Sequence, residues 1–173
     1  MKVFYLLAAL FFSALGHAKE KTPTATELEA FARANNEFNR SLVNLTNREK
    51  YCKESATILP ANTFQGLNIS PAEKKTALRY YYLKASADCS DTALRDYLVS
   101  SGILTAMLYP VDPDRASTLQ ESQELILDTQ VRLLEVGIEY ERLDEGLRES
   151  LEKIDDLEKP FKLIESSDAL GLK

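Results

Sequence analysis

The sequence is poor in the residues that carry most enzyme and metal chemistry. Its 173 residues include one histidine, His17, two cysteines and no tryptophan. A Ser-His-Asp or Cys-His nucleophile needs the histidine as its base, and many zinc sites use imidazole ligands. Because His17 lies in a segment with the character of a removable leader, we expect the mature chain to have no histidine. The composition therefore predicts a non-enzymatic protein that holds no metal and no cofactor.

Phosphate-binding signals are missing as well. The chain contains neither G-x-x-x-x-G-K-[ST] nor G-x-G-x-x-G, the glycine-rich patterns that cradle phosphates. It has 21 Lys and Arg against 27 Asp and Glu, a net charge of −6, with no basic cluster. Nucleic acids and anionic membrane surfaces are bound through clustered Lys and Arg. Neither is therefore an expected partner of this chain.

The first eighteen residues have the pattern of a secretory signal peptide. Lys2 supplies a positive start, residues 3–15 are apolar, and Gly16-His17-Ala18 offers small residues at the −3 and −1 positions of a cleavage site. Cleavage after Ala18 would leave 155 residues with 20 basic and 27 acidic side chains, a net charge of −7. No later apolar run is long enough to span a bilayer. We expect a periplasmic or secreted protein with no membrane span after cleavage.

Two cysteines, Cys52 and Cys89, remain in this expected mature chain. In an exported protein such a pair is most simply one disulfide bond. The alternative is a redox or metal-binding pair, but the two are far apart in sequence and have no histidine nearby. We predict a structural disulfide.

Helix signals dominate the sequence. Thr24 and Glu27 form a capping box ahead of a helix expected over residues 25–56, and Ser70 and Glu73 form a second one, with Pro71 at the first helical position. Residues 57–70 lack helical periodicity and are expected to form a loop. The chain beyond is predicted to form a helix over 71–87, a short turn over Asp88-Cys89-Ser90-Asp91, and a helix over 91–109 that ends at Pro110.

The last part of the chain has a seven-residue apolar repeat, typical of a coiled-coil seam. It predicts one helix over about 115–158, roughly 65 Å long, which must either break or project from the domain. Gly137 and Gly146 are its candidate weak points, and residues 160–173 are expected to form a short helical turn and then a frayed tail. The main row of the repeat is Leu119, Ile126, Leu133, Tyr140, Leu147, Ile154 and Phe161. A second row three positions later contains Val136, Leu143, Leu157 and Ile164.

These elements predict an all-α, single-domain bundle of about four helices over residues 19–159, with a long C-terminal helix. The first helix is its expected antiparallel partner because both are long. Residues 125–138 are apolar on most sides, as for a helix enclosed by neighbours, whereas residues 139–158 hold nine acidic side chains. If the first helix cannot cover the whole repeat, a stripe remains for a second copy. A homodimer is therefore a further hypothesis.

The candidate binding residues are tyrosines and acids. Tyr80, Tyr81 and Tyr82 span about 200° of a helix, so they cannot all be buried on one narrow face. Either two pack in the core and one lies on the surface, or the exposed ring belongs to a partner-binding surface, a role that tyrosine suits. The acidic half of the long helix would favour a basic partner. Its candidate contact residues are Glu141, Asp144, Glu145, Glu149 and Glu152.

Other local patterns have simpler explanations than catalysis. The Ser-x-x-Lys match from Ser150 to Lys153 lies on an expected solvated face, and Asp112-Pro113-Asp114 reads as a turn with a helix cap. The sequence thus favours an exported protein-binding module: an inhibitor, an immunity protein, a chaperone-like holder or an adaptor for another exported protein. Two alternatives stay open. One is a bundle that binds a small molecule between its helices, and the other is a carboxylate-based enzyme.

Overall fold

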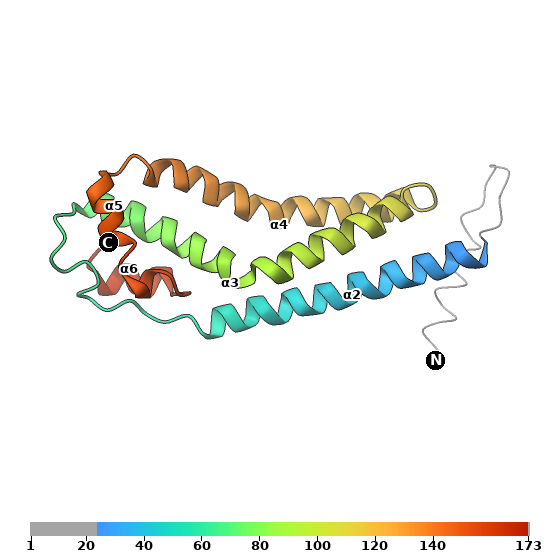
Figure 1. The fold of residues 1–173 in the computed structure, drawn as a ribbon, viewed down its shortest axis with the longest axis horizontal. Coiled ribbons are helices and arrows are strands. Elements are labelled where there is room, and N and C mark those ends of the chain that lie inside the picture. The colour runs from blue at the N-terminus through green and yellow to red at the C-terminus, as the bar shows by residue number, and fades with distance from the viewer. Residues whose placement is uncertain (1–23, 173) are drawn as a thin grey trace.

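The computed structural model describes residues 24–172, so the expected signal peptide lies outside the described part of the chain. Within that part the protein is an all-α single domain, as predicted, and no residue lies in a β-strand. Three long helices run along the molecule and the shorter ones gather at one end, near the C-terminus (Figure 1). The elements are α2 (Ala25–Glu54), α3 (Pro71–Leu108), α4 (Pro113–Tyr140), α5 (Glu145–Leu151), the 3-10 helix η1 (Asp155–Leu157) and α6 (Leu163–Ala169).

Both predicted capping boxes are confirmed. The Thr24 hydroxyl accepts the Glu27 N–H at 3.2 Å, and the Glu27 carboxylate accepts the Thr24 N–H at 2.7 Å. At the start of α3 the same exchange joins Ser70 and Glu73, at 3.3 and 2.8 Å. Hydrogen bonds that the Glu73 carboxylate accepts from the Ser70 side chain and from the Ser70 backbone N–H lower the pKa of this carboxyl. Both boxes satisfy backbone N–H groups that have no partner within the helix.

The predicted turn at residues 88–91 is wrong, because α3 continues through it as one helix. None of the four residues is glycine or proline, and their polar side chains are accommodated on the helix. The Ser90 hydroxyl donates to the Ser86 carbonyl at 3.2 Å, and Asp91 forms an ion pair with Arg95 one turn later. Back-bonding of this kind often bends a helix. The helix does bend near its middle (Figure 1).

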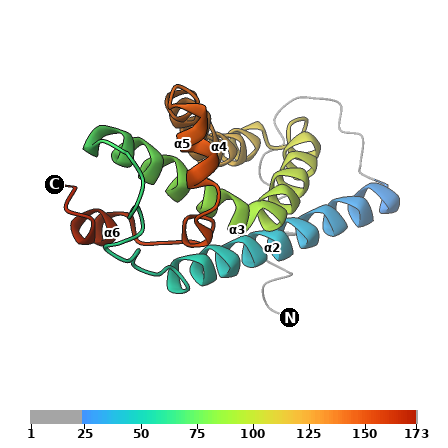
Figure 2. The ribbon, with the colours of Figure 1, turned by 60° about the vertical axis from the view of Figure 1, so that its left-hand side comes forward.

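The bent helix α3 is the centre of the molecule and packs against α2 on one side and α4 on the other (Figures 1 and 2). The expected antiparallel pairing of the first and last long helices is therefore wrong, since α2 and α4 scarcely approach each other. The expectation that residues 125–138 are enclosed is also wrong. With α3 as its main neighbour, α4 exposes large aliphatic side chains on two flanks. They are Leu125, Leu127, Val131, Leu134 and Ile138.

The expected long C-terminal helix breaks after Tyr140. A turn over residues 141–144 follows, and Asp144 then caps α5 by accepting the Leu147 N–H at 3.1 Å. The break falls between Gly137 and Gly146, the two predicted weak points, and both glycines lie inside helices. The acidic residues after 140 are thus divided between a turn and short helices. They do not form the acidic face of one long helix.

Residues 160–172 pack into the domain instead of fraying. Phe161, Ser166 and Leu172 are buried, and α6 supplies the expected short helix. The Thr57 N–H donates to the Pro160 carbonyl at 3.1 Å, and the Thr57 carbonyl accepts the Lys162 N–H at 2.8 Å. The Ser166 hydroxyl accepts the buried Leu59 N–H at 3.0 Å. The C-terminal segment therefore closes the core beneath the loop that joins α2 to α3.

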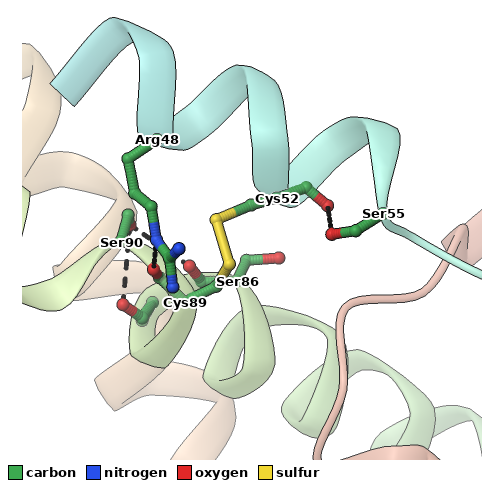
Figure 3. The surroundings of a disulfide bond; sticks show 7 residues. Arg48, Cys52, Ser55, Ser86, Cys89 and Ser90 are labelled. Atoms are coloured by element: carbon green, nitrogen blue, oxygen red, sulfur yellow. Dashed lines mark hydrogen bonds between the residues drawn. A yellow bond between two sulfur atoms is a disulfide. The ribbon is translucent and has the colours of Figure 1, made fainter. Parts of the chain in front are cut away.

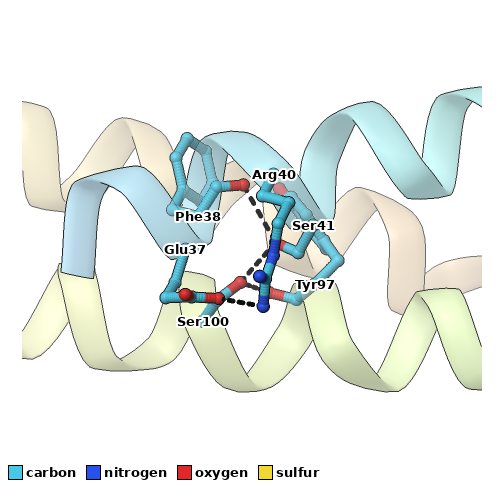
Figure 4. A network of polar contacts seen from close by, with 6 residues as sticks. All are labelled: Glu37, Phe38, Arg40, Ser41, Tyr97 and Ser100. Atoms are coloured by element: carbon cyan, nitrogen blue, oxygen red, sulfur yellow. Dashed lines mark hydrogen bonds and ion pairs between the residues drawn. The ribbon is translucent and has the colours of Figure 1, made fainter. Parts of the chain in front are cut away.

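The core is distributed along the molecule in three clusters. The largest lies at the C-terminal end and the other two lie along α3 toward the α3–α4 turn. Small polar residues occupy the helix contacts between them: Ser41 of α2 and Ser100 of α3 share a hydrogen bond at 2.5 Å (Figure 4). Gln123 of α4 donates to the Ser101 hydroxyl at 2.7 Å. The buried hydroxyls of Ser41, Ser100 and Ser101 therefore all have partners, as burial requires.

Candidate partner-binding groove

A groove of about 1220 Å³ opens at the middle of the molecule. Its walls are the C-terminal end of α2, the middle of α3, one flank of α4, and residues 160–165. The groove exists because α2 and α4 both pack on α3 and leave the space between them open. Its large apolar side chains are Tyr82, Leu94, Leu125, Ile126, Phe161, Leu163 and Ile164.

The predicted disulfide between Cys52 and Cys89 is confirmed, with the two Cα atoms 6.1 Å apart. It joins the last turns of α2 to the middle of α3 (Figure 3). Cys52 also lines the groove. The Arg48 Nε–H donates to the Cys89 carbonyl at 2.5 Å, and its guanidinium lies 5.0 Å from the centre of the Tyr51 ring. The covalent bond and the arginine together fix the α2 wall of the groove against α3.

Two apolar side chains at the groove are exposed to a degree that is unusual for residues of their size. Leu125 of α4 is 76% exposed and Ile164 of α6 is 74% exposed. The charged side chains that line the groove carry both signs equally and are Glu49, Lys50, Lys53, Glu54, Lys162 and Glu165. A balanced lining gives no strong preference for a ligand of either charge. The arrangement is suited to apolar contact.

The predicted tyrosine site is divided between core and groove. Tyr81 is buried and shares a hydrogen bond at 3.0 Å with the Tyr140 hydroxyl, while the Tyr80 ring stacks on Tyr140 with ring centres 4.0 Å apart. Burial raises the pKa of all three phenols. Tyr82 lies edge-on to Phe161, with ring centres 5.9 Å apart, and lines the groove. Tyr82 alone of the three reaches this candidate site.

The predicted acidic contact residues lie elsewhere. Glu141 forms an ion pair with Arg148, Asp144 caps α5, and none of the five lines the groove. All five are exposed and belong to the turn and to the region of α5. They are Glu141, Asp144, Glu145, Glu149 and Glu152. Their surroundings give at least Glu141 and Asp144 a role in local structure.

The sequence alone does not single out Leu125 and Ile164 as candidate binding residues. Leu125 lies in the segment that is apolar on most sides, and Ile164 lies in the second row of the repeat. Their exposure depends on which helices pair, and the apolar periodicity does not specify that. The signal in the sequence that could have indicated exposed apolar residues is that residues 125–138 carry more apolar side chains than one neighbouring helix can cover.

A second exposed apolar surface lies on another face of α4. Leu127, Val131, Leu134 and Ile138 are spaced by four, three and four residues, which aligns them along the helix. We name this row the outer stripe of α4. Its four side chains are between 42% and 69% exposed.

Residues 24–172 were also searched for metal-ligand groups and for membrane-spanning helices. Within this range no three His, Cys, Asp or Glu side chains are grouped so that they could hold a metal ion. None of the helices described has the length and apolarity needed to cross a membrane.

The comparisons with known proteins give no relative from which a function could be transferred. No protein-family model matches the sequence, and no curated protein or solved structure is significantly similar to it. The exposed apolar surfaces of the chain are therefore the main indication of its function.

Proposed function

We propose that this protein is an exported, non-enzymatic binding module whose groove receives an amphipathic helix of another exported protein. The observation that carries the proposal is the pair of aliphatic side chains, Leu125 and Ile164, exposed at an apolar groove. Large apolar side chains that are exposed at one groove commonly mark a protein interaction site. The leader-like first eighteen residues and the disulfide are both consistent with export.

The volume of the groove is that of a short helical segment. A volume of about 1220 Å³ corresponds to on the order of two to three turns of a helix 10–12 Å across. Helix-in-groove binding places apolar residues at i, i+3, i+4 and i+7 on such a floor. Polar residues on the rest of the partner helix would then lie beside the mixed charges that border the groove.

A small ligand is the alternative occupant of the same groove. Small-molecule sites usually bury most of their ligand and aim a few polar groups at it. Here Leu125 and Ile164 are largely exposed to solvent. Such exposure is expected of side chains that become buried only when a macromolecule binds.

Site-specific photo-crosslinking in the cells that make the protein tests the proposal. A photoreactive amino acid is placed at Leu125 or at Ile164, with Val99 of α3 as the control, because Val99 is 63% exposed but does not line the groove. We expect an adduct with one other protein from both groove positions and none from Val99. The adduct formed from position 125 should disappear in Ile164→Glu and persist in Val99→Glu.

Three outcomes contradict the proposal. Loss of the adduct in Val99→Glu as well would show that the adduct does not depend on the groove. An adduct of twice the chain mass would replace the other protein with a second copy. No protein adduct at either groove position would favour the small-ligand alternative, which a thermal-shift screen of metabolites would then examine.

A further inference from the structure

The outer stripe of α4 lies to one side of the face that packs on α3. The α3-facing row includes Ile126 and Tyr140, and at 100° per residue the stripe lies roughly 110° around the helix from that row. Leu125, which lines the groove, lies about 100° away on the opposite flank. The stripe and the groove are therefore two separate surfaces.

The stripe has the pattern of half of a two-helix seam. Leu127, Val131, Leu134 and Ile138 occupy alternating a- and d-type positions over about two heptads. An a/d seam normally packs against a second helix, because burying aliphatic side chains away from water lowers the free energy. Among residues 24–172 no element covers these four side chains, which are at least 42% exposed.

The border of the stripe is acidic on the side turned away from α3. Glu124, Asp128 and Glu135 fall there by helical position, and all three are exposed. The basic side chain nearest to them in sequence, Arg132, is engaged by Asp128 at 2.9 Å. A helix that pairs with the stripe would bring its own flanking positions beside these carboxylates.

We propose that the outer stripe of α4 binds an amphipathic helix of a partner protein whose two-heptad apolar face is flanked by Lys and Arg. Flanking charges set the choice of partner and the orientation in helix pairs. A second copy of α4 fits less well, because antiparallel pairing would place Asp128 of one copy near Glu135 of the other. This site is distinct from the groove and does not rest on the function proposed for it.

Two synthetic peptides test the proposal against the full-length processed protein with its disulfide intact. Both carry the same Leu and Ile positions on a helix of three heptads. One has Lys at the flanking positions and the other has Glu. At low salt we expect the Lys-flanked peptide to bind about tenfold more tightly by fluorescence anisotropy, with a preference that shrinks as salt rises.

Variants assign the binding to the stripe. Leu134→Glu should abolish it, and Val99→Glu, at an exposed site of α3 outside both surfaces, should leave it unchanged. The double variant Glu124→Lys with Glu135→Lys changes only exposed side chains and should favour the Glu-flanked peptide instead. Far-UV circular dichroism of each variant establishes that the helices are retained.

Several results would overturn the proposal. Equal affinity for the two peptides would indicate nonspecific apolar adhesion, and no binding of either would remove the site. Binding lost in Leu125→Glu but kept in Leu134→Glu would transfer it to the groove. Sedimentation equilibrium showing a dimer that Leu134→Glu dissociates would make a second copy the occupant. Failure of the crosslinks at positions 125 and 164 would leave this test unaffected.

Discussion

Tyr81 and Tyr140 satisfy each other's hydroxyl groups inside the largest core cluster. Removing one hydroxyl leaves the other without this partner in a buried position, which costs about 1–3 kcal/mol. We therefore expect Tyr81→Phe to lower the free energy of unfolding by this amount in urea titrations. Tyr109→Phe, at a 59% exposed site, is the matched control and should change it little.

A double-mutant cycle separates the hydrogen bond from the loss of two hydroxyls. Tyr81→Phe with Tyr140→Phe removes both partners, so its cost should be smaller than the sum of the two single variants. Strict additivity would show that the 3.0 Å contact contributes no coupling between the hydroxyls.

The same phenols make stability depend on alkaline pH. Burial raises the pKa of Tyr81, Tyr80 and Tyr140 in the folded chain, while in the unfolded chain they ionise near pH 10. Their contribution is therefore complete below about pH 10 and is lost progressively as the pH rises above it. Wild type should lose stability between about pH 9.5 and 11 more steeply than the triple Phe variant, which keeps every lysine. Parallel profiles for the two proteins would contradict this account.

Among the connections between elements, the disulfide has the largest expected effect. It closes a separation of 37 residues, for which the chain-entropy model gives a stabilisation of roughly 3–4 kcal/mol. Cys52→Ser with Cys89→Ser should lower the unfolding free energy by about that amount. A reductant should destabilise wild type similarly and leave the double variant unaffected. Equal urea midpoints with and without reductant would show that the bond adds no stability.

The sequence predicted the elements better than it predicted their pairing. Helix starts at Ala25 and Pro71 followed from local hydrogen bonds at Thr24 and Ser70, and such bonds depend on neighbouring residues alone. The turn predicted at residues 88–91 is wrong. Ser and Asp favour turns, but they are tolerated in a helix, and here the Ser90 hydroxyl donates to the Ser86 carbonyl one turn earlier. The break after Tyr140 was anticipated only as one of two alternatives.

The candidate site could be predicted only in part for the same reason. A cap is a local interaction, whereas a groove requires knowing that α2 and α4 both choose α3 as their partner. The apolar repeat predicts an apolar face on α4 but does not specify which helix packs against it. Tyr82 was found through its unusual neighbours in sequence. Leu125 and Ile164 became candidates only through their exposure.

Buried residues are distributed unevenly along the molecule, and the stability of each segment against local unfolding should vary with the number of its buried residues. The first four turns of α2, up to Arg40, contain no buried residue; the first is Ser41. The segment Ala77–Ala85 of α3, by contrast, contains four buried residues held between α4 and the C-terminal helices. Helical segments with few buried contacts open locally, so their amide hydrogens exchange without global unfolding.

Hydrogen exchange read by mass spectrometry should therefore divide the chain. Peptides from residues 25–40 should exchange much faster than peptides from residues 77–85, although both are regular helix. Cys52→Ser with Cys89→Ser should extend fast exchange along α2 toward Glu54, because the covalent tie to α3 is then gone, and should leave residues 77–85 protected. Equal protection of the two segments would mean that the long helices open only as one cooperative unit. In that case the uneven burial along α2 would have no counterpart in its local stability.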